Sequence, residues 1–110
     1  MERSIKSKQR KLRQLNFTVS ADGLTVSGLD KNQVSVADTG TGVKTITLSE
    51  AFAAADYCVQ VTSGTALMVA NAVITDSSVF VVNSLTASTG AAADAICQIT
   101  VIGSDVSDRY

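Results

Sequence analysis

The sequence predicts an all-β fold: an antiparallel β-sandwich or jelly roll of about eight short strands, preceded by a basic N-terminal arm that is extended or partly helical. Three observations lead to this prediction. The residue mixture, rich in Val, Ser and Thr and free of Pro, favours strands over helices. Short apolar runs alternate with turn residues at regular intervals. No segment has a helical pattern that could carry the crossovers of a parallel sheet.

The chain is expected to form one domain with an arm. Its 110 residues suit a single domain, and 45% hydrophobic content against 17% charged content is normal for a packed core. We place the arm at residues 1–14 and the sandwich at residues 15–110. The basic start is not followed by an apolar stretch, so neither a signal peptide nor a membrane span is expected.

The arm and the domain carry opposite charge. Six basic residues against Glu2 give residues 1–14 a net charge of +5, whereas three basic and nine acidic residues give residues 15–110 a net charge of −6. A cationic tail of this kind typically binds an anionic surface, although it can also be merely solvated. The candidate partner-binding residues are Arg3, Ile5, Lys6, Lys8, Arg10, Lys11, Leu12 and Arg13.

A protein is the expected partner of the arm. Ile5, Leu12 and Leu15 would lie loosely on one side of a helix and could contact apolar depressions. Nucleic acid is disfavoured, because the arm has no aromatic residue for base stacking and the acidic domain would repel phosphate.

The first two strands form a predicted hairpin. Residues 16–20 and 24–27 are short β-type runs on either side of Ala21-Asp22-Gly23. Glycine accepts a positive φ without strain, so this segment is typical of a tight turn between antiparallel strands.

A second hairpin is expected over residues 33–37 and 43–48, joined by a Gly-rich turn at residues 38–42. In the second run Ile46 and Leu48 alternate with threonines, so one face of this strand is buried and the other is wet.

A loop is expected to follow at residues 49–55, anchored by Phe52, although a single helical turn capped by Ser49 would also fit. Two later runs, 69–74 and 79–82, are apolar on both faces, which a small two-layer domain cannot bury alone. Part of their surface is therefore expected to contact another subunit in a homo-oligomer. The remaining four strands are expected at residues 57–62, 66–75, 78–83 and 95–102.

The composition of the chain excludes most catalytic and metal-binding sites. The chain has no His, so Ser-His-Asp and Cys-His sites are impossible, and no segment has the spacing of a phosphate-binding or dinucleotide-binding loop. Cys58 and Cys97 lack the close spacing of a zinc site; buried free thiols are expected, with pairing possible only if their strands meet. We therefore expect no enzyme activity, cofactor, metal or small-molecule substrate.

Two short segments suggest a catalytic alternative, an aspartic protease. Asp38-Thr39-Gly40 resembles the active-site triplet of aspartic proteases, and Val101-Ile102-Gly103 resembles the segment that supports this triplet in the retroviral type. A dimer could then bring two Asp38 carboxylates together. The same residues are typical of an ordinary β-turn between strands, which is the favoured interpretation.

A resemblance to virus proteins covers residues 34–103. Its features, in order, are the run 34–42 entering a strand, Ala51-Phe52-Ala53 before Asp56-Tyr57-Cys58-Val59, and the Ser-rich strand 77–81. A small-residue loop at 88–94 then leads into an apolar strand that ends at Gly103. In this order of features the chain resembles the small β-sandwich domains of bacteriophage tail fibres and capsid decoration (cement) proteins.

This resemblance implies a virion structural protein on the capsid surface, made in the host cytoplasm. It also implies a trimer as the favoured homo-oligomer. As a decoration protein, the chain would bind the major capsid protein and tie neighbouring coat subunits together. Its arm would lie across an acidic groove of the coat, with its basic residues paired with carboxylates. The alternative that the resemblance leaves open is a tail-fibre or spike module that binds a host receptor.

Overall fold

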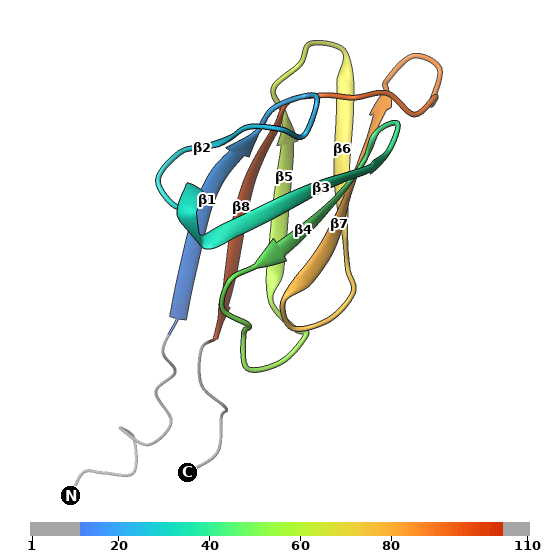
Figure 1. Cartoon of the computed structure of the whole chain (residues 1–110). Helices are drawn as coiled ribbons and strands as arrows, with labels where there is room; N and C mark the ends of the chain where they lie inside the picture. The colour runs from blue at the N-terminus through green and yellow to red at the C-terminus, as the bar shows by residue number, and fades with distance from the viewer. Residues whose placement is uncertain (1–11, 105–110) are drawn as a thin grey trace, which may run out of the picture.

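The computed structural model describes residues 12–104, which form a β-sandwich of two antiparallel sheets (Figure 1). The predicted all-β sandwich is thereby confirmed. A 3-10 turn, η1 (Lys31–Gln33), precedes the third strand. The strands are β1 (Leu12–Val19), β2 (Val26–Ser27), β3 (Val34–Gly40), β4 (Val43–Leu48), β5 (Cys58–Ser63), β6 (Met68–Ile74), β7 (Val79–Thr86) and β8 (Cys97–Ser104).

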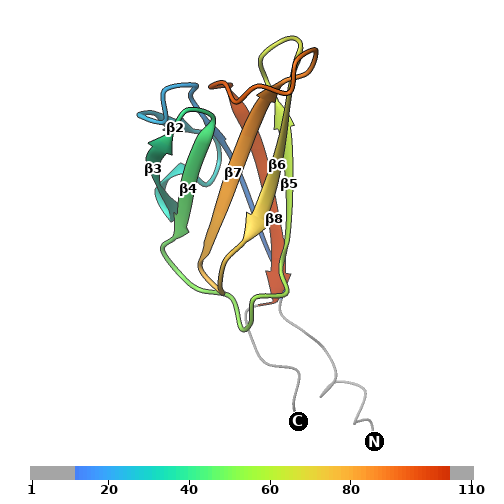
Figure 2. The ribbon, with the colours of Figure 1, turned by 90° about the vertical axis from the view of Figure 1, so that its right-hand side faces the viewer.

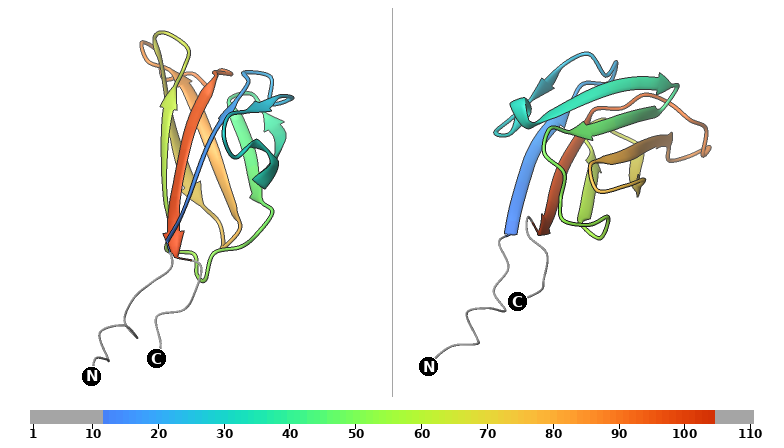
Figure 3. Two further views of the ribbon diagram at one scale, coloured as in Figure 1. Left: turned by 90° about the vertical axis from the view of Figure 1, so that its left-hand side faces the viewer. Right: turned by 60° about the horizontal axis from the view of Figure 1, so that its bottom comes forward.

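Each sheet contains four strands, in the orders β2-β1-β8-β5 and β3-β4-β7-β6. Figure 2 shows the two layers, and the left view of Figure 3 shows blue β1, red β8 and yellow-green β5 side by side. The longest-range pairing joins the two ends of the domain, because β1 pairs with β8 from Leu12 opposite Ser104 to Val19 opposite Cys97. The chain therefore enters and leaves the sandwich at the same end.

The core lies between the sheets and follows from alternation along the strands. Every second residue of β1 and β8 points inward, as in Leu15 and Phe17 on β1 and Ile99 on β8. Ile46 and Phe80 face them from β4 and β7. The period-two apolar pattern in the sequence thus becomes one continuous core.

Both predicted hairpins are present. β2 pairs with the end of β1, and Gly23 in the connection has a φ of 74°. β3 pairs with β4, but the predicted turn at residues 38–42 is wrong in extent, because residues 38–40 pair with β4 as part of β3 and only residues 41–42 form the turn. Gly42 in this turn has a φ of 70°. A Cβ at Gly42 would lie 2.6 Å from the carbonyl oxygen of Ser84. Both the positive φ and this close approach therefore require glycine at position 42.

The segment 49–55 is a loop that buries Phe52, as preferred from the sequence. The Phe52 ring stacks on Tyr57 with centroids 4.9 Å apart, beneath Gly103 of β8. The turn η1 was not predicted, and β1 begins at Leu12, three residues before the expected start of the domain. Among residues 12–104, no helix is long and apolar enough to cross a membrane.

Candidate functional site

Most of the predicted partner-binding residues lie outside the described part of the chain: Arg3, Ile5, Lys6, Lys8, Arg10 and Lys11. Leu12 and Arg13 are the exceptions, because both belong to β1. Leu12 is largely exposed and remains available to a partner. Leu15, which was expected to fill a depression in the partner, is 3% exposed and belongs to the chain's own core, so that expectation is wrong.

Arg13 is held by its own domain. It occupies an inward position of β1, and its guanidinium carbon lies 4.2 Å from the centroid of the Phe52 ring. Its Nη2 donates a hydrogen bond of 2.9 Å to the carbonyl oxygen of Glu50, and its Nη1 lies 3.5 Å from the Glu50 carboxylate. Arg13 therefore lies at the end of the sandwich where the chain enters and leaves, and Glu50 of the same chain is a carboxylate partner.

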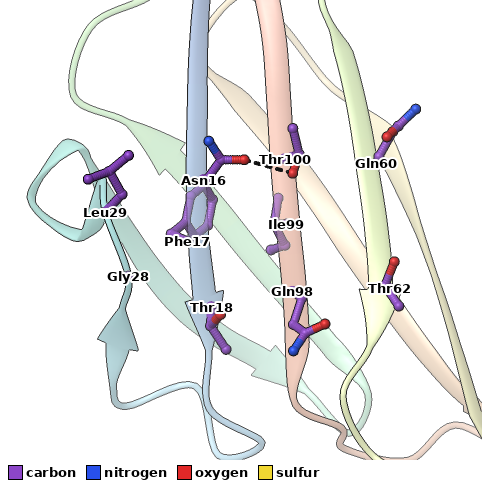
Figure 4. A pocket seen from close by; sticks show the side chains of 10 residues that line it. All are labelled: Asn16, Phe17, Thr18, Gly28, Leu29, Gln60, Thr62, Gln98, Ile99 and Thr100. Atoms are coloured by element: carbon purple, nitrogen blue, oxygen red, sulfur yellow. Dashed lines mark hydrogen bonds between the residues drawn. The ribbon is translucent and has the colours of Figure 1, made fainter.

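A shallow depression of about 350 Å³ lies on the outer face of the sheet β2-β1-β8-β5 (Figure 4). Its lining contains no charged residue. Two rows of amide and hydroxyl side chains cross the three long strands of this sheet. The rows are Asn16, Thr100 and Gln60, and Thr18, Gln98 and Thr62.

Two side chains of one row are fixed by hydrogen bonds. Thr100 Oγ1 donates to Asn16 Oδ1 at 2.9 Å, and Gln14 Nε2 donates to the same oxygen at 3.3 Å. The other polar side chains of the depression, those of Thr18, Gln60, Thr62 and Gln98, have no hydrogen-bond partner among residues 12–104. They are therefore available to a ligand or to water.

The wall of the depression is the loop between β2 and β3. Asp30 ties this loop to β1, since its Oδ2 accepts a bond of 2.7 Å from the Asn16 amide and its own amide donates to the Asn16 carbonyl at 3.0 Å. The loop carries Gly28 and Leu29, and Leu29 is 85% exposed. An apolar side chain thus borders the polar floor.

The outer face of the other sheet is also uncharged but more aliphatic. Val73 pairs with Val81, and Val69 pairs with Leu85. Val69 and Val73 are about half exposed. The outward positions of this sheet are Ser35, Ala37, Thr39, Val43, Thr45, Thr47, Val69, Asn71, Val73, Val79, Val81, Asn83 and Leu85.

The cysteines lie at opposite ends of one strand pair. Cys58 pairs with Ile102, whereas Cys97 pairs with Ser63. Cys97 is buried, and this burial raises the pKa of its thiol. Cys58 is exposed on the outer face, so the expectation that both thiols are buried is wrong for Cys58. Both cysteines are free.

The two segments that resemble aspartic proteases do not meet. Asp38 lies on β3, paired with Lys44, and its Oδ1 accepts a hydrogen bond of 3.3 Å from the Gly40 amide. Gly103 lies on β8 in the other sheet, packed against Phe52. The arrangement that supports the catalytic triplet in such proteases is therefore not formed by these segments.

No group of three or more His, Cys, Asp or Glu side chains within residues 12–104 is placed to hold a metal ion. Comparisons of the chain with protein-family models, with curated proteins and with solved structures found no match. The function is therefore inferred from the faces of the sandwich and from the sequence.

Proposed function

We propose that the chain is a non-enzymatic structural protein of a virus particle, a decoration protein that binds the outer capsid surface. The observation that carries this proposal is the placement of charge. The outward strand positions of both sheets are uncharged, whereas the charged side chains of residues 12–104 lie in loops and turns or at inward strand positions. A face without charged side chains costs less free energy to desolvate than a charged face when another protein covers it, which favours a protein that works by assembly.

The sheet β3-β4-β7-β6 is the face that we assign to contacts between copies. Its row of Val73, Val81 and Thr45 crosses three strands without a charged neighbour. Two copies that place such faces together meet no like-charge repulsion, and each buried aliphatic side chain gains hydrophobic free energy. This face supports the proposed homo-oligomer, whereas the trimer as its favoured state rests on the resemblance to phage proteins.

The arm is the segment that we assign to the major capsid protein. Its basic residues would pair with carboxylates of the coat, and each exposed pair contributes only about 0–1 kcal/mol. Holding power must therefore come from several contacts and from the presence of one arm on each copy of the oligomer. Because the arm continues directly into β1, force on it is carried by the ladder between β1 and β8.

The proposal is tested by co-sedimentation with undecorated phage capsids. The full chain is compared with a variant that lacks residues 1–11, at low and at moderate salt. We expect saturable binding of the full chain that salt weakens, and loss of binding by the truncated chain. The truncation ends at residue 11 because Leu12 and Arg13 belong to β1.

A matched control keeps the length of the arm but replaces its Lys and Arg residues before Leu12 with Gln. This variant should bind as poorly as the truncated chain if charge is responsible. Capsid binding by the truncated chain would contradict the assignment of the arm. Absence of binding by the full chain would overturn the decoration role and favour the tail-fibre or spike alternative.

A further inference from the structure

We propose that the depression on the outer face of β1, β8 and β5 binds a neutral carbohydrate. This inference does not rest on the decoration role, since it concerns a different surface. Its starting point is the lining, which offers amide and hydroxyl groups from three adjacent strands and contains no charged side chain (Figure 4). A charged ligand would find no opposite charge here, whereas a sugar hydroxyl needs neutral donors and acceptors.

The spacing of the polar groups suits a flat ligand with several hydroxyls. Neighbouring strands lie about 4.8 Å apart, and side chains on one face of a strand repeat after about 6.6 Å. The rows that contain Thr100 and Gln98 therefore present their groups as a grid. Amides and hydroxyls each donate and accept, so one grid can satisfy the hydroxyls of a pyranose ring.

The site is partly built before a ligand arrives. The hydrogen bond between Thr100 and Asn16 orients these two side chains, while Gln60, Thr62 and Gln98 keep free polar groups. Groups that are fixed in advance lose less conformational entropy on binding, which favours affinity.

The rim supplies the apolar contact that a sugar ring requires for its C–H face. Leu29 is exposed beside the polar floor, on a loop that Asp30 holds against β1. The loop comes close to β1 at Gly28, where an added Cβ would lie 3.1 Å from the Cα of Phe17 and where φ is +105°. A side chain at this position would push the rim away from the floor.

A protein partner fits this surface less well. Protein interfaces are centred on large apolar or aromatic anchors, and the only exposed apolar side chain that borders this depression in the described chain is Leu29. The aliphatic face of the opposite sheet has that character instead. The polar depression and the aliphatic face therefore suit different partners.

The test is a titration of the isotope-labelled full chain, followed by backbone amide NMR signals. The probes are neutral oligosaccharides of glucose, galactose and N-acetylglucosamine, together with sialyllactose as a charged comparison. We expect at least one neutral sugar to shift signals of β1, β5 and β8 with a Kd of about 1 mM, because no aromatic ring stacks on the ligand. Sialyllactose should bind no better than its neutral core.

A double variant and a matched control test whether the sugar binds in the depression. Gln98→Ala together with Gln60→Ala removes two free amides and should weaken binding about 10-fold. Asn83→Ala is the matched control, because it removes an amide from the outer face of the other sheet and should leave binding unchanged. No signal shift with any neutral sugar would overturn the proposal. Shifts confined to β6 and β7, or equal affinity in the double variant, would overturn it as well.

Discussion

Lys44 is a lysine in the core of a small sandwich. Its side chain is 1% exposed at an inward position of β4, and its Nζ donates one long hydrogen bond, 3.4 Å, to the carbonyl oxygen of Ala95. The carbon stem fills space in the core, while the ammonium group has one long hydrogen bond and a minor electrostatic interaction with Asp22. We therefore expect the stem to contribute more to stability than the ammonium group.

We expect Lys44→Met to preserve or raise the free energy of unfolding, because Met keeps the apolar volume and removes a buried charge. Lys44→Ala should lower it by about 2–4 kcal/mol, since a cavity replaces the stem. Urea unfolding of both variants measures the difference. Equal destabilisation by Met and Ala would mean that the ammonium group, and not the stem, stabilises the fold.

Tyr57 makes the free energy of unfolding depend on pH in the alkaline range. Burial, and secondarily the negative charge of Asp76, raises the pKa of Tyr57 to about 12. Its hydroxyl donates to the carbonyl oxygens of Asp76 and Val79 at 2.8 and 3.1 Å. The unfolded chain ionises near pH 10, so the stabilisation by the neutral phenol is complete below about pH 10 and is lost as pH rises towards about 12.

Tyr57→Phe should therefore flatten the alkaline loss of stability. At neutral pH this variant should be less stable by about 1 kcal/mol, because the hydrogen bonds of the Tyr57 hydroxyl to two partly buried carbonyls are lost. Chemical unfolding at several pH values between neutrality and the alkaline limit measures both effects. Parallel pH profiles for the two proteins would show that Tyr57 is not the titrating group.

At the scale of elements, strand positions could be predicted from the sequence because alternation is a local signal. The predicted run 43–48 coincides with β4, and Phe52 anchors a loop as expected. The start of β1 could not be predicted, because Arg13 looks like part of a charged arm until Glu50, 37 residues away, and the Phe52 ring are placed beside it. The local charge pattern indicates that Arg13 belongs to the arm, whereas its tertiary contacts place it in β1.

The depression was missed from the sequence for a related reason. Gln60 and Gln98 each alternate with apolar residues in their own runs, which indicates only an outward position. They become neighbours because β8 lies between β1 and β5, an order that joins distant segments of the chain. The same order makes the strands of Cys58 and Cys97 neighbours. The two thiols nevertheless lie at opposite ends of this strand pair and do not form a disulfide.

β8 also contains a position where only glycine fits. A Cβ at Gly103 would lie 2.7 Å from both Phe52 Cδ1 and Tyr57 Cβ, at a strand position opposite Arg13. We expect Gly103→Ala to lower the free energy of unfolding by about 1–3 kcal/mol through displacement of the aromatic pair. Gly40→Ala is the matched control, since its nearest neighbour would lie 3.9 Å away. Thermal unfolding compares them, and similar losses would contradict this account.

At the scale of the whole molecule, residues 1–14 carry a net charge of +5 and residues 15–110 carry a net charge of −6. In the structure residues 12–14 belong to β1, and the guanidinium of Arg13 contacts Glu50 and Phe52. Residues 1–11 should thus be removable without loss of stability, whereas residues 12–14 should not.

We expect deletion of residues 1–11 to leave the free energy of unfolding unchanged within about 0.5 kcal/mol. Deletion of residues 1–14 should lower it by about 1–3 kcal/mol, because the pairing of Leu12 and Arg13 with β8 and the contacts of Arg13 are lost together. Urea unfolding of the two truncated chains beside the full chain measures the step. Arg13→Gln in the full chain isolates the guanidinium from the backbone ladder. Equal stability of both truncated chains would place the boundary after Gln14 and leave Arg13 to a partner.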